Sequence, residues 1–162
     1  KYSFQKKIII GRKIKNICKK TKVKFLVNDD PILALRIGAD GCHLGQKDMN
    51  IKEAKKIIGK QIIGITCHNS INLAKKAIKA KASYLAFGAF FSSKTKKNAH
   101  VASIKILNKI KKITKTPIVA IGGINSKNYK NLLLNNANFL AISGYIWNNK
   151  KYKPLKALER LK

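Results

Sequence analysis

The sequence predicts an α/β fold of the (β/α)8 barrel type, in which helices cover the outer face of a parallel sheet. Six short apolar runs are each followed by a segment whose apolar residues recur at helical spacing. Strands that are apolar throughout are typical of parallel sheets covered on both faces. The runs begin about 20 to 30 residues apart, which is the tight spacing of βα units in such barrels.

The predicted strands are short, and polar or glycine-containing loops follow them. They are expected at residues 24–28, 41–45, 61–65, 84–88, 117–121 and 139–143. A closed barrel of this type needs eight strands, and the chain opens on a helical pattern. Either two βα units are absent from the front of the chain, or the sheet is not a closed barrel. We therefore expect residues 1–162 to form a single barrel-type domain that is N-terminally incomplete.

The predicted helices are recognised by the spacing of their apolar residues and by the residues at their ends. They are expected at residues 4–20, 31–37, 50–59, 70–80, 102–112, 126–135 and 153–161. Pro31 suits a first helical turn, and Gly38 marks the end of that helix. Asn50, Ser70 and Ser126 are expected to cap the helices that follow them, because their side-chain oxygens can accept from free backbone N–H groups.

The net charge is +30, from 33 lysines and three arginines against six acidic residues. A field of that size attracts nucleic acid and anionic membranes without any specific site. Dedicated nucleic-acid surfaces, however, favour arginine for bidentate contacts and interleave it with aromatic residues. The excess of lysine over arginine indicates a compositional bias toward lysine. We expect no specific nucleic-acid partner.

The cysteines and the apolar runs together predict a cytoplasmic protein. Cys18, Cys42 and Cys67 are an odd number and lack CxxC spacing, so neither disulfides nor a zinc site is expected. Buried thiols in a reducing compartment are the better interpretation. No apolar run reaches transmembrane length, and the N-terminal residues do not resemble a signal peptide. A membrane partner is therefore not expected, and a homo-oligomer is left open.

Acidic residues gather in one stretch of this basic chain. Residues 25–49 hold four of the six acids, and Asp29 and Asp48 come just after two predicted strands. The carboxyl ends of the strands carry the functional groups in a parallel barrel. Carboxylates there are hard oxygen ligands, suited to a Mg²⁺ shared with substrate phosphates. The alternative is that each Asp only caps the helix that follows it.

The loops after the last two predicted strands indicate a phosphate site. Gly122-Gly123 and Ser143-Gly144 stand there. Glycine lets backbone N–H groups approach a phosphate closely, and the last two loops of such barrels usually hold one. The alternative is that these glycines only satisfy the geometry of a turn.

Three further residues could do chemistry at the same rim. His68 could act as an acid or base, or could simply hydrogen-bond the backbone. Lys96 gains interest from Thr95 beside it in a long loop. His100 has no supporting neighbours in the sequence.

Several motifs, taken together and in order, resemble thiamine phosphate synthases. They are NDD-PILAL, DG-CHLGQKD, GITCH, FGAFFSSKTKKNA, IVAIGGI and FLAISGYI, and they cover nearly the whole chain. The resemblance implies a (β/α)8 barrel that joins hydroxymethylpyrimidine diphosphate to a thiazole phosphate. It also implies that Mg²⁺ is the cofactor and that thiamine phosphate and pyrophosphate are the products.

The resemblance implies a role for each matching residue. Asp29 and Asp48 would coordinate Mg²⁺ on the diphosphate with help from Asn28, while Asp30 and Asp40 would have structural roles. Thr66, where the family usually has Ser, and Lys96 would contact the diphosphate during catalysis. The thiazole phosphate would be held by Ser93, Thr95 and the backbone of Gly123, Ile142 and Ser143. Departure of pyrophosphate would leave a pyrimidine cation, which the thiazole nitrogen traps; neutralising the leaving group matters more than a strong base.

The chain departs from the family pattern at three places. Ser92 and Ser93 replace a usual proline and threonine, and the last loop reads ISGY where VVSA is common. The family's first two strands, which supply an Arg-x-Lys pair to the diphosphate, have no counterpart.

Two alternatives therefore remain beside the synthase. One is a thiazole tautomerase-like barrel that uses His68, and the other is an inactive, truncated basic barrel fragment. The pair of Asp29 and Asp48 favours the synthase, because an isomerase needs no diphosphate metal.

Overall fold

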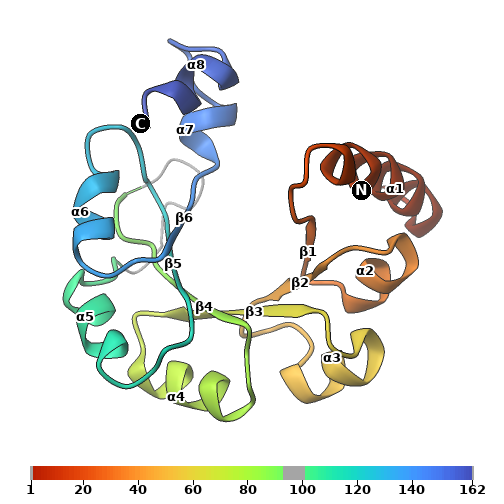
Figure 1. Cartoon of the computed structure of the whole chain (residues 1–162), viewed down its shortest axis with the longest axis horizontal. Helices are drawn as coiled ribbons and strands as arrows, with labels where there is room; N and C mark the ends of the chain where they lie inside the picture. The colour runs from red at the N-terminus through yellow and green to blue at the C-terminus, as the bar shows by residue number, and fades with distance from the viewer. Residues whose placement is uncertain (1, 93–100, 162) are drawn as a thin grey trace. The chain divides into compact units, whose positions relative to one another are not determined.

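The structure is a computed structural model that describes residues 2–92 and 101–161 (Figure 1). Its contacts divide the chain into two compact units. Unit 1 comprises Lys1–Thr66 and Ala80–Ser83, and unit 2 comprises Cys67–Lys79 and Tyr84–Lys162. The predicted α/β class is confirmed, because strands and helices alternate along the chain.

The strands of unit 1 pair in parallel. They are β1 (Leu26–Asn28), β2 (Gly41–Leu44) and β3 (Ile62–His68), whose last two residues belong to unit 2. Asn28 lies opposite His43, and Leu44 lies opposite Ile65. The carboxyl ends of β1 and β2 therefore lie side by side, while β3 continues for three residues beyond the end of β2.

The strands of unit 2 are also parallel. They are β4 (Tyr84–Phe87), β5 (Ile118–Ile121) and β6 (Phe139–Ala141). Ile121 lies opposite Ala141, so the loops that leave β5 and β6 begin next to each other. Each of the six predicted strands is thus present, and only β3 extends well beyond its predicted end.

The helices of unit 1 are α1 (Phe4–Lys20), α2 (Pro31–Ile37) and α3 (Ile51–Ile58). Figure 1 shows α1 and α2 beside β1 and β2, and the two helices pack against each other. The predicted ends hold: Gly38 ends α2 in the left-handed conformation, and Asn50 caps α3 by accepting from Glu53 N at 3.0 Å. The end of α2 and the start of α3 are therefore set by the residue types at those positions.

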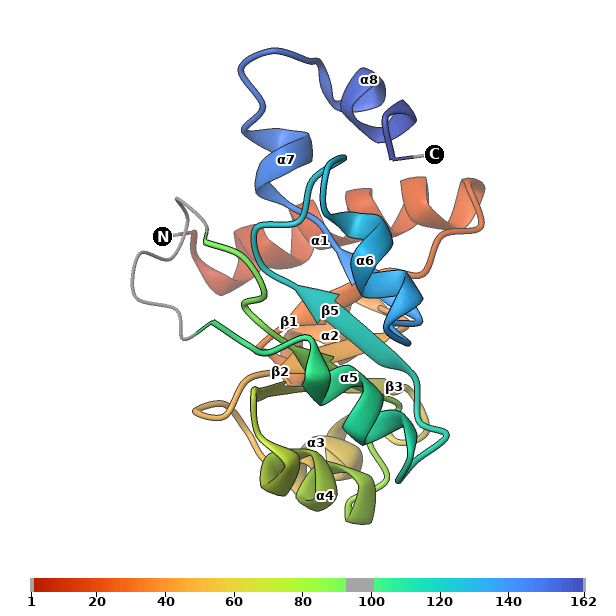
Figure 2. The same ribbon diagram turned by 90° about the vertical axis from the view of Figure 1, so that its left-hand side faces the viewer.

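The helices of unit 2 are α4 (Ile71–Lys79), α5 (Lys105–Lys111), α6 (Tyr129–Leu134), α7 (Gly144–Trp147) and α8 (Pro154–Glu159). Figures 1 and 2 place α6 beside β5. Ser70 caps α4 as predicted, accepting from Leu73 N at 3.2 Å.

The predicted cap at Ser126 is wrong. α6 begins later, at Tyr129, because the Asn128 side chain folds back to accept from Asn125 N at 2.9 Å and closes a turn. The helix α7 was not predicted from the sequence.

Each unit has its own apolar core. In unit 1 the core includes Ala34, Ile37, Leu44, Ile58 and Ile63, and in unit 2 it includes Leu85, Phe87, Leu107, Ile118 and Leu132. All three cysteines are free thiols. Burial raises the pKa of Cys42 to about 11 and that of Cys67 to about 12, as expected of unreactive core thiols. Among the described residues, no helix is long and apolar enough to cross a membrane.

Candidate active site

Asp29 stands at the carboxyl end of β1, in an unusual backbone conformation. Its φ is 68°, in the left-handed region, and its N–H donates to His43 O at 2.8 Å across to β2. Asp tolerates this region better than most residues, but a cost remains. The helix cap is instead Asp30, whose side chain accepts from Leu33 N at 2.9 Å. The capping alternative is therefore wrong for Asp29, and the structural role of Asp30 is confirmed.

Asp48 lies in the loop after β2 and folds back toward the strand end. Its Oδ2 accepts from Gly45 N at 2.6 Å. The next helix is capped by Asn50, so Asp48 is not a helix cap either. Within the described ranges Asp48 forms no ion pair, although the chain carries 33 lysines. Its carboxylate is thus fixed at the strand end without being neutralised by a lysine.

Asp40 has the structural role that was predicted for it. It accepts from Lys15 Nζ at 2.5 Å, from Phe25 N at 2.8 Å and from Lys24 Nζ at 3.4 Å. The hydrogen bond from Lys15, followed by that from the Phe25 backbone, lowers its pKa to about 2. Asp40 therefore ties α1 to the start of β1.

Thr66 is held in place by two residues of the HLGQ motif. Its Oγ1 lies 2.8 Å from His43 Nε2, and its carbonyl accepts a hydrogen bond from the Gln46 side chain. Burial lowers the pKa of His43, and the nearby charge of Asp48 opposes this only in part. The imidazole is therefore neutral near pH 7, and it can orient the Thr66 hydroxyl without adding a charge.

This pairing was not predicted from the sequence, where neither His43 nor Gln46 was given a role. The pairing depends on the strand register, which cannot be read from the sequence. β2 and β3 pair so that His43 lies opposite Gly64, two residues before Thr66.

The donors at this rim fit Mg²⁺ better than a metal held by protein ligands alone. No group of three or more His, Cys, Asp or Glu residues gathers to hold a metal in the parts of the chain that are described. Mg²⁺ usually binds through one or two carboxylates plus substrate phosphates and water. Asp29 and Asp48 at neighbouring strand ends provide that kind of donor set.

In unit 2 the glycines after β5 are required by the turn itself. Gly122 and Gly123 have φ of 102° and 63°. A Cβ at Gly123 would lie 2.6 Å from the carbonyl oxygens of Phe91 and Ser92. The loop leaving β4 passes against this turn, and Phe91 N donates to Gly122 O at 3.1 Å. Turn geometry thus explains both glycines, and their role toward a phosphate stays a prediction.

The other predicted site residues of unit 2 are only partly placed. Ile142 follows β6 and is half-buried, and Ser143 is exposed just before α7. Ser93, Thr95 and Lys96, with His100, lie outside the described residues. His68 is exposed at the last position of β3, not in a loop, with a φ of 51°.

The chain is similar to one known family and to individual proteins within it. Residues 3–146 match the family described as thiamine monophosphate synthase. A thiamine-phosphate synthase of Pelagibacter ubique is 69% identical over 156 residues, which is 96% of this chain and 75% of that protein. One from Marinobacter nauticus is 43% identical over 85% of this chain, and 62% of that protein is covered. The chain therefore spans 62% to 75% of the length of these two relatives.

One solved structure gives the same result, and a second shares the fold. A thiamine phosphate pyrophosphorylase from Pyrococcus furiosus matches 99% of this chain and 76% of its own, with a TM-score of 0.90 and 32% identity. An orotidine 5'-phosphate decarboxylase from Pyrococcus horikoshii matches with a TM-score of 0.67 over 93% of this chain and 78% of its own, at 13% identity. The second likeness concerns the fold alone.

Proposed function

This chain belongs to the thiamine monophosphate synthase family, and we propose that it couples hydroxymethylpyrimidine diphosphate with a thiazole phosphate in a Mg²⁺-dependent reaction. The products would be thiamine phosphate and pyrophosphate, which makes the enzyme a transferase. The observation that carries the proposal is the pair of Asp29 and Asp48 at neighbouring strand ends, where neither serves as a helix cap.

Unit 1 would hold the diphosphate. Asp29 and Asp48 would be the metal ligands, with the Asn28 side chain next to them on β1. Bound Mg²⁺ would neutralise charge on the leaving pyrophosphate. Thr66 would donate its hydroxyl hydrogen to a diphosphate oxygen, and the support for this is the way His43 and Gln46 fix that residue.

Unit 2 would hold the thiazole phosphate. The backbone N–H groups of Gly123, Ile142 and Ser143 would be its donors, and the register of β5 and β6 supports this because the two loops start side by side. Ser93 and Thr95 would add hydroxyl donors, and Lys96 would contact the diphosphate. These three assignments rest on the resemblance of the loop to the family motif.

The reaction requires one bond to break and one to form. The C–O bond to the diphosphate breaks, and its electron pair leaves with pyrophosphate. The resulting pyrimidine methylene cation is trapped when the lone pair of the thiazole nitrogen forms the C–N bond. No strong base is needed, so neutral donors such as Thr66 suit the leaving group. The residues at the rim thus match the demands of the chemistry.

We further propose that the chain supplies six of the eight βα units of a (β/α)8 barrel, without the first two strands. The length of the Pelagibacter ubique relative supports this, because the chain covers 75% of it. A second support lies in unit 1, where β1 pairs with β2 and an apolar groove of about 270 Å³ runs between α1 and β1. Ile10, Ile14, Phe25 and Leu26 line the groove, and further strands would cover such a surface.

The partners and location follow from the same proposal. The substrates would be the two small phosphorylated molecules, with no specific nucleic-acid partner. The three free thiols support a reducing, cytoplasmic setting.

The direct test is to incubate the chain with both phosphorylated substrates and Mg²⁺ and to measure thiamine phosphate. A version extended to the length of the Pelagibacter ubique relative should be tested in parallel. We expect product from the extended version, and none after the metal is chelated. If the extended version forms no product but isomerises the thiazole, the tautomerase alternative is correct and the synthase proposal is wrong.

A further inference from the structure

Unit 2 contains a pocket that the proposed reaction does not use. It has a volume of about 480 Å³. Its walls come from the turn after β5, from α7 and from the segment around α8. The lining residues are Asn125, Ser126, Lys127, Tyr145, Asn149, Lys151, Tyr152 and Arg160. Neither Gly123 nor Ser143 lines it, but the Asn125 side-chain amide donates to Gly123 O at 3.3 Å, so the pocket adjoins the residues assigned to the thiazole phosphate.

The pocket is strongly basic. Lys127, Lys151 and Arg160 line it, and no acidic residue does. Within the described part of the chain, none of these three cations forms an ion pair. Like charges gathered around one cavity repel one another, and an anion in the cavity would relieve that repulsion.

Two of the cations are held by one aromatic ring. Arg160 Cζ lies 4.8 Å from the centroid of the Tyr152 ring, and Lys151 Nζ lies 5.6 Å from it. A ring attracts cations through its quadrupole, but it does not neutralise them. The charges therefore stay available to a ligand. Because both cations use the Tyr152 ring, that ring is a poor stacking surface for a nucleic-acid base.

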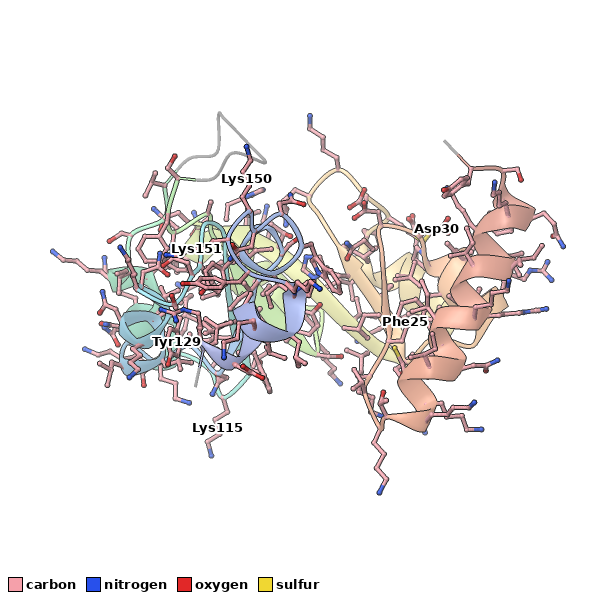
Figure 3. The ribbon with its side chains drawn as sticks, turned by 90° about the horizontal axis from the view of Figure 1, so that it is seen from above. Phe25, Asp30, Lys115, Tyr129, Lys150 and Lys151 are labelled. Carbon is pink, nitrogen blue, oxygen red and sulfur yellow. The ribbon has the colours of Figure 1, made fainter. Side chains whose placement is uncertain are left out.

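A hydrogen-bonded turn fixes this wall in place. Asn149 Oδ1 accepts from Lys151 N at 2.9 Å and from Tyr152 N at 3.0 Å. The Asn149 side-chain amide also donates to Tyr145 O at 2.9 Å. One asparagine thus links α7 to the segment that carries Lys151, which Figure 3 labels together with its neighbour Lys150. The backbone that carries Lys151 is therefore fixed, while the side chains of Lys127, Lys151 and Arg160 are exposed.

Tyr145 gives an independent indication of a ligand. Its hydroxyl is buried and has no hydrogen-bond partner among the described residues. A buried donor of this kind normally finds an acceptor. The hydroxyl oxygen itself is covered in the free protein, so an oxygen of a bound anion would accept from it once the Tyr145 side chain turns toward the pocket that it lines.

We propose that this pocket binds a small phosphate anion with at least two negative charges, such as a diphosphate or a nucleotide. Three cations without an ion pair among the described residues, gathered around one cavity of about 480 Å³, suit a compact polyanion better than a long nucleic-acid strand. Both kinds of ligand would be recognised through their phosphate groups. Inorganic pyrophosphate and a nucleoside diphosphate are therefore the two probes, and the difference in their affinities shows which kind of ligand the pocket prefers.

The test measures binding of each probe to the full chain by titration calorimetry, with EDTA present so that no metal site contributes. The variant replaces Lys127, Lys151 and Arg160 by Gln. Its matched control replaces Lys130, Lys150 and Lys153 by Gln, which removes the same charge from exposed positions outside the pocket. We expect the pocket variant to bind at least about tenfold more weakly than the control, because charge-assisted hydrogen bonds are lost only there.

A milder variant removes the donor alone. Tyr145→Phe should weaken binding several-fold without lowering the melting temperature, because the lost hydroxyl has no partner in the free protein. Equal binding by the pocket variant and its control would overturn the proposal, since the anion would then only sense the net charge. The proposal would also be overturned if the substitutions in the pocket variant weakened the binding of a single-stranded oligonucleotide more than the binding of either small probe.

Discussion

His43 Nε2 lies 2.8 Å from Thr66 Oγ1, across the neighbouring strands β2 and β3 of unit 1. The contact joins the HLGQ motif to the residue proposed to meet the diphosphate. Because burial lowers the pKa of His43, the contact involves a neutral ring near pH 7. A neutral partner can set the direction of the Thr66 hydroxyl while leaving the charge of the site to the metal ligands and to lysine.

We predict that His43→Leu lowers kcat by about tenfold, because Thr66 loses the hydrogen bond that orients it. KM for the diphosphate substrate should change less. The measurement is steady-state kinetics on the extended version of the chain. The matched control is His68→Leu, which removes an exposed imidazole at the end of β3. Loss of coupling activity in His68→Leu but not in His43→Leu would show that the role given to His43 is wrong.

Asp48 gives the second prediction. Asp48→Ala should abolish Mg²⁺-dependent coupling and leave the fold intact, at a cost of about 1 kcal/mol for the lost bond to Gly45 N. Asp48→Asn keeps an acceptor for that bond but removes the charge, so it should be as stable as the wild type and still inactive. Glu53→Gln, at an exposed position in α3, is the control for charge. Normal turnover by Asp48→Asn would show that the metal assignment is wrong.

Much of the fold could be predicted because the signals are local. The helix at residues 4–20 was found from its apolar spacing, and Asn50 and Ser70 were found as caps from residue type alone. The predicted cap at Ser126 was wrong because Asn125 and Asn128 form a competing turn. Residue type alone does not show whether the cap or the turn is the more stable. The helix α7 is only four residues long, too short for any periodicity to show.

For the candidate site, the sequence predicted the types of functional residue and their places after the strands, but not the contacts between them. The positions of Asp29 and Asp48 after strand ends were visible in the sequence, and the structure removes the capping alternative by showing Asp30 and Asn50 as the caps. The partner of Thr66 was not visible, because it depends on how β2 and β3 align. Nor was the reason for Gly123, which is set by the approach of a loop about 30 residues earlier in the chain.

Two glycines with similar backbone give a third prediction. Gly38 and Gly123 have φ of 67° and 63°, but a Cβ meets nothing within 4 Å at Gly38 and meets two carbonyl oxygens at 2.6 Å at Gly123. Gly38→Ala should cost only the left-handed strain, about 1 kcal/mol. Gly123→Ala should cost about 2 to 3 kcal/mol, because crowding adds to that strain. Urea unfolding measures both, and equal losses would contradict the packing of the β5 turn against the loop leaving β4.

Asp40 gives the last prediction, which concerns pH. Its pKa falls from 3.8 to about 2 on folding, chiefly through the hydrogen bond from Lys15. A carboxyl group whose pKa is lowered in the folded state stabilises the protein above its unfolded pKa. The side chain is 18% exposed, so solvent screens part of the effect, and we expect Asp40→Asn to lose about 1 to 2 kcal/mol at pH 7.

That loss should itself depend on pH. The difference in unfolding free energy between wild type and Asp40→Asn should be constant above about pH 5, since Asp40 is then ionised in both states. It should shrink as the pH falls from 3.8 toward about 2, where folded Asp40 also takes up a proton. Urea unfolding at a series of pH values measures this, with Glu53→Gln as the exposed control. A difference that stays the same down to pH 2 would mean that Asp40 ties α1 to β1 by its shape and hydrogen bonds, and not by its charge.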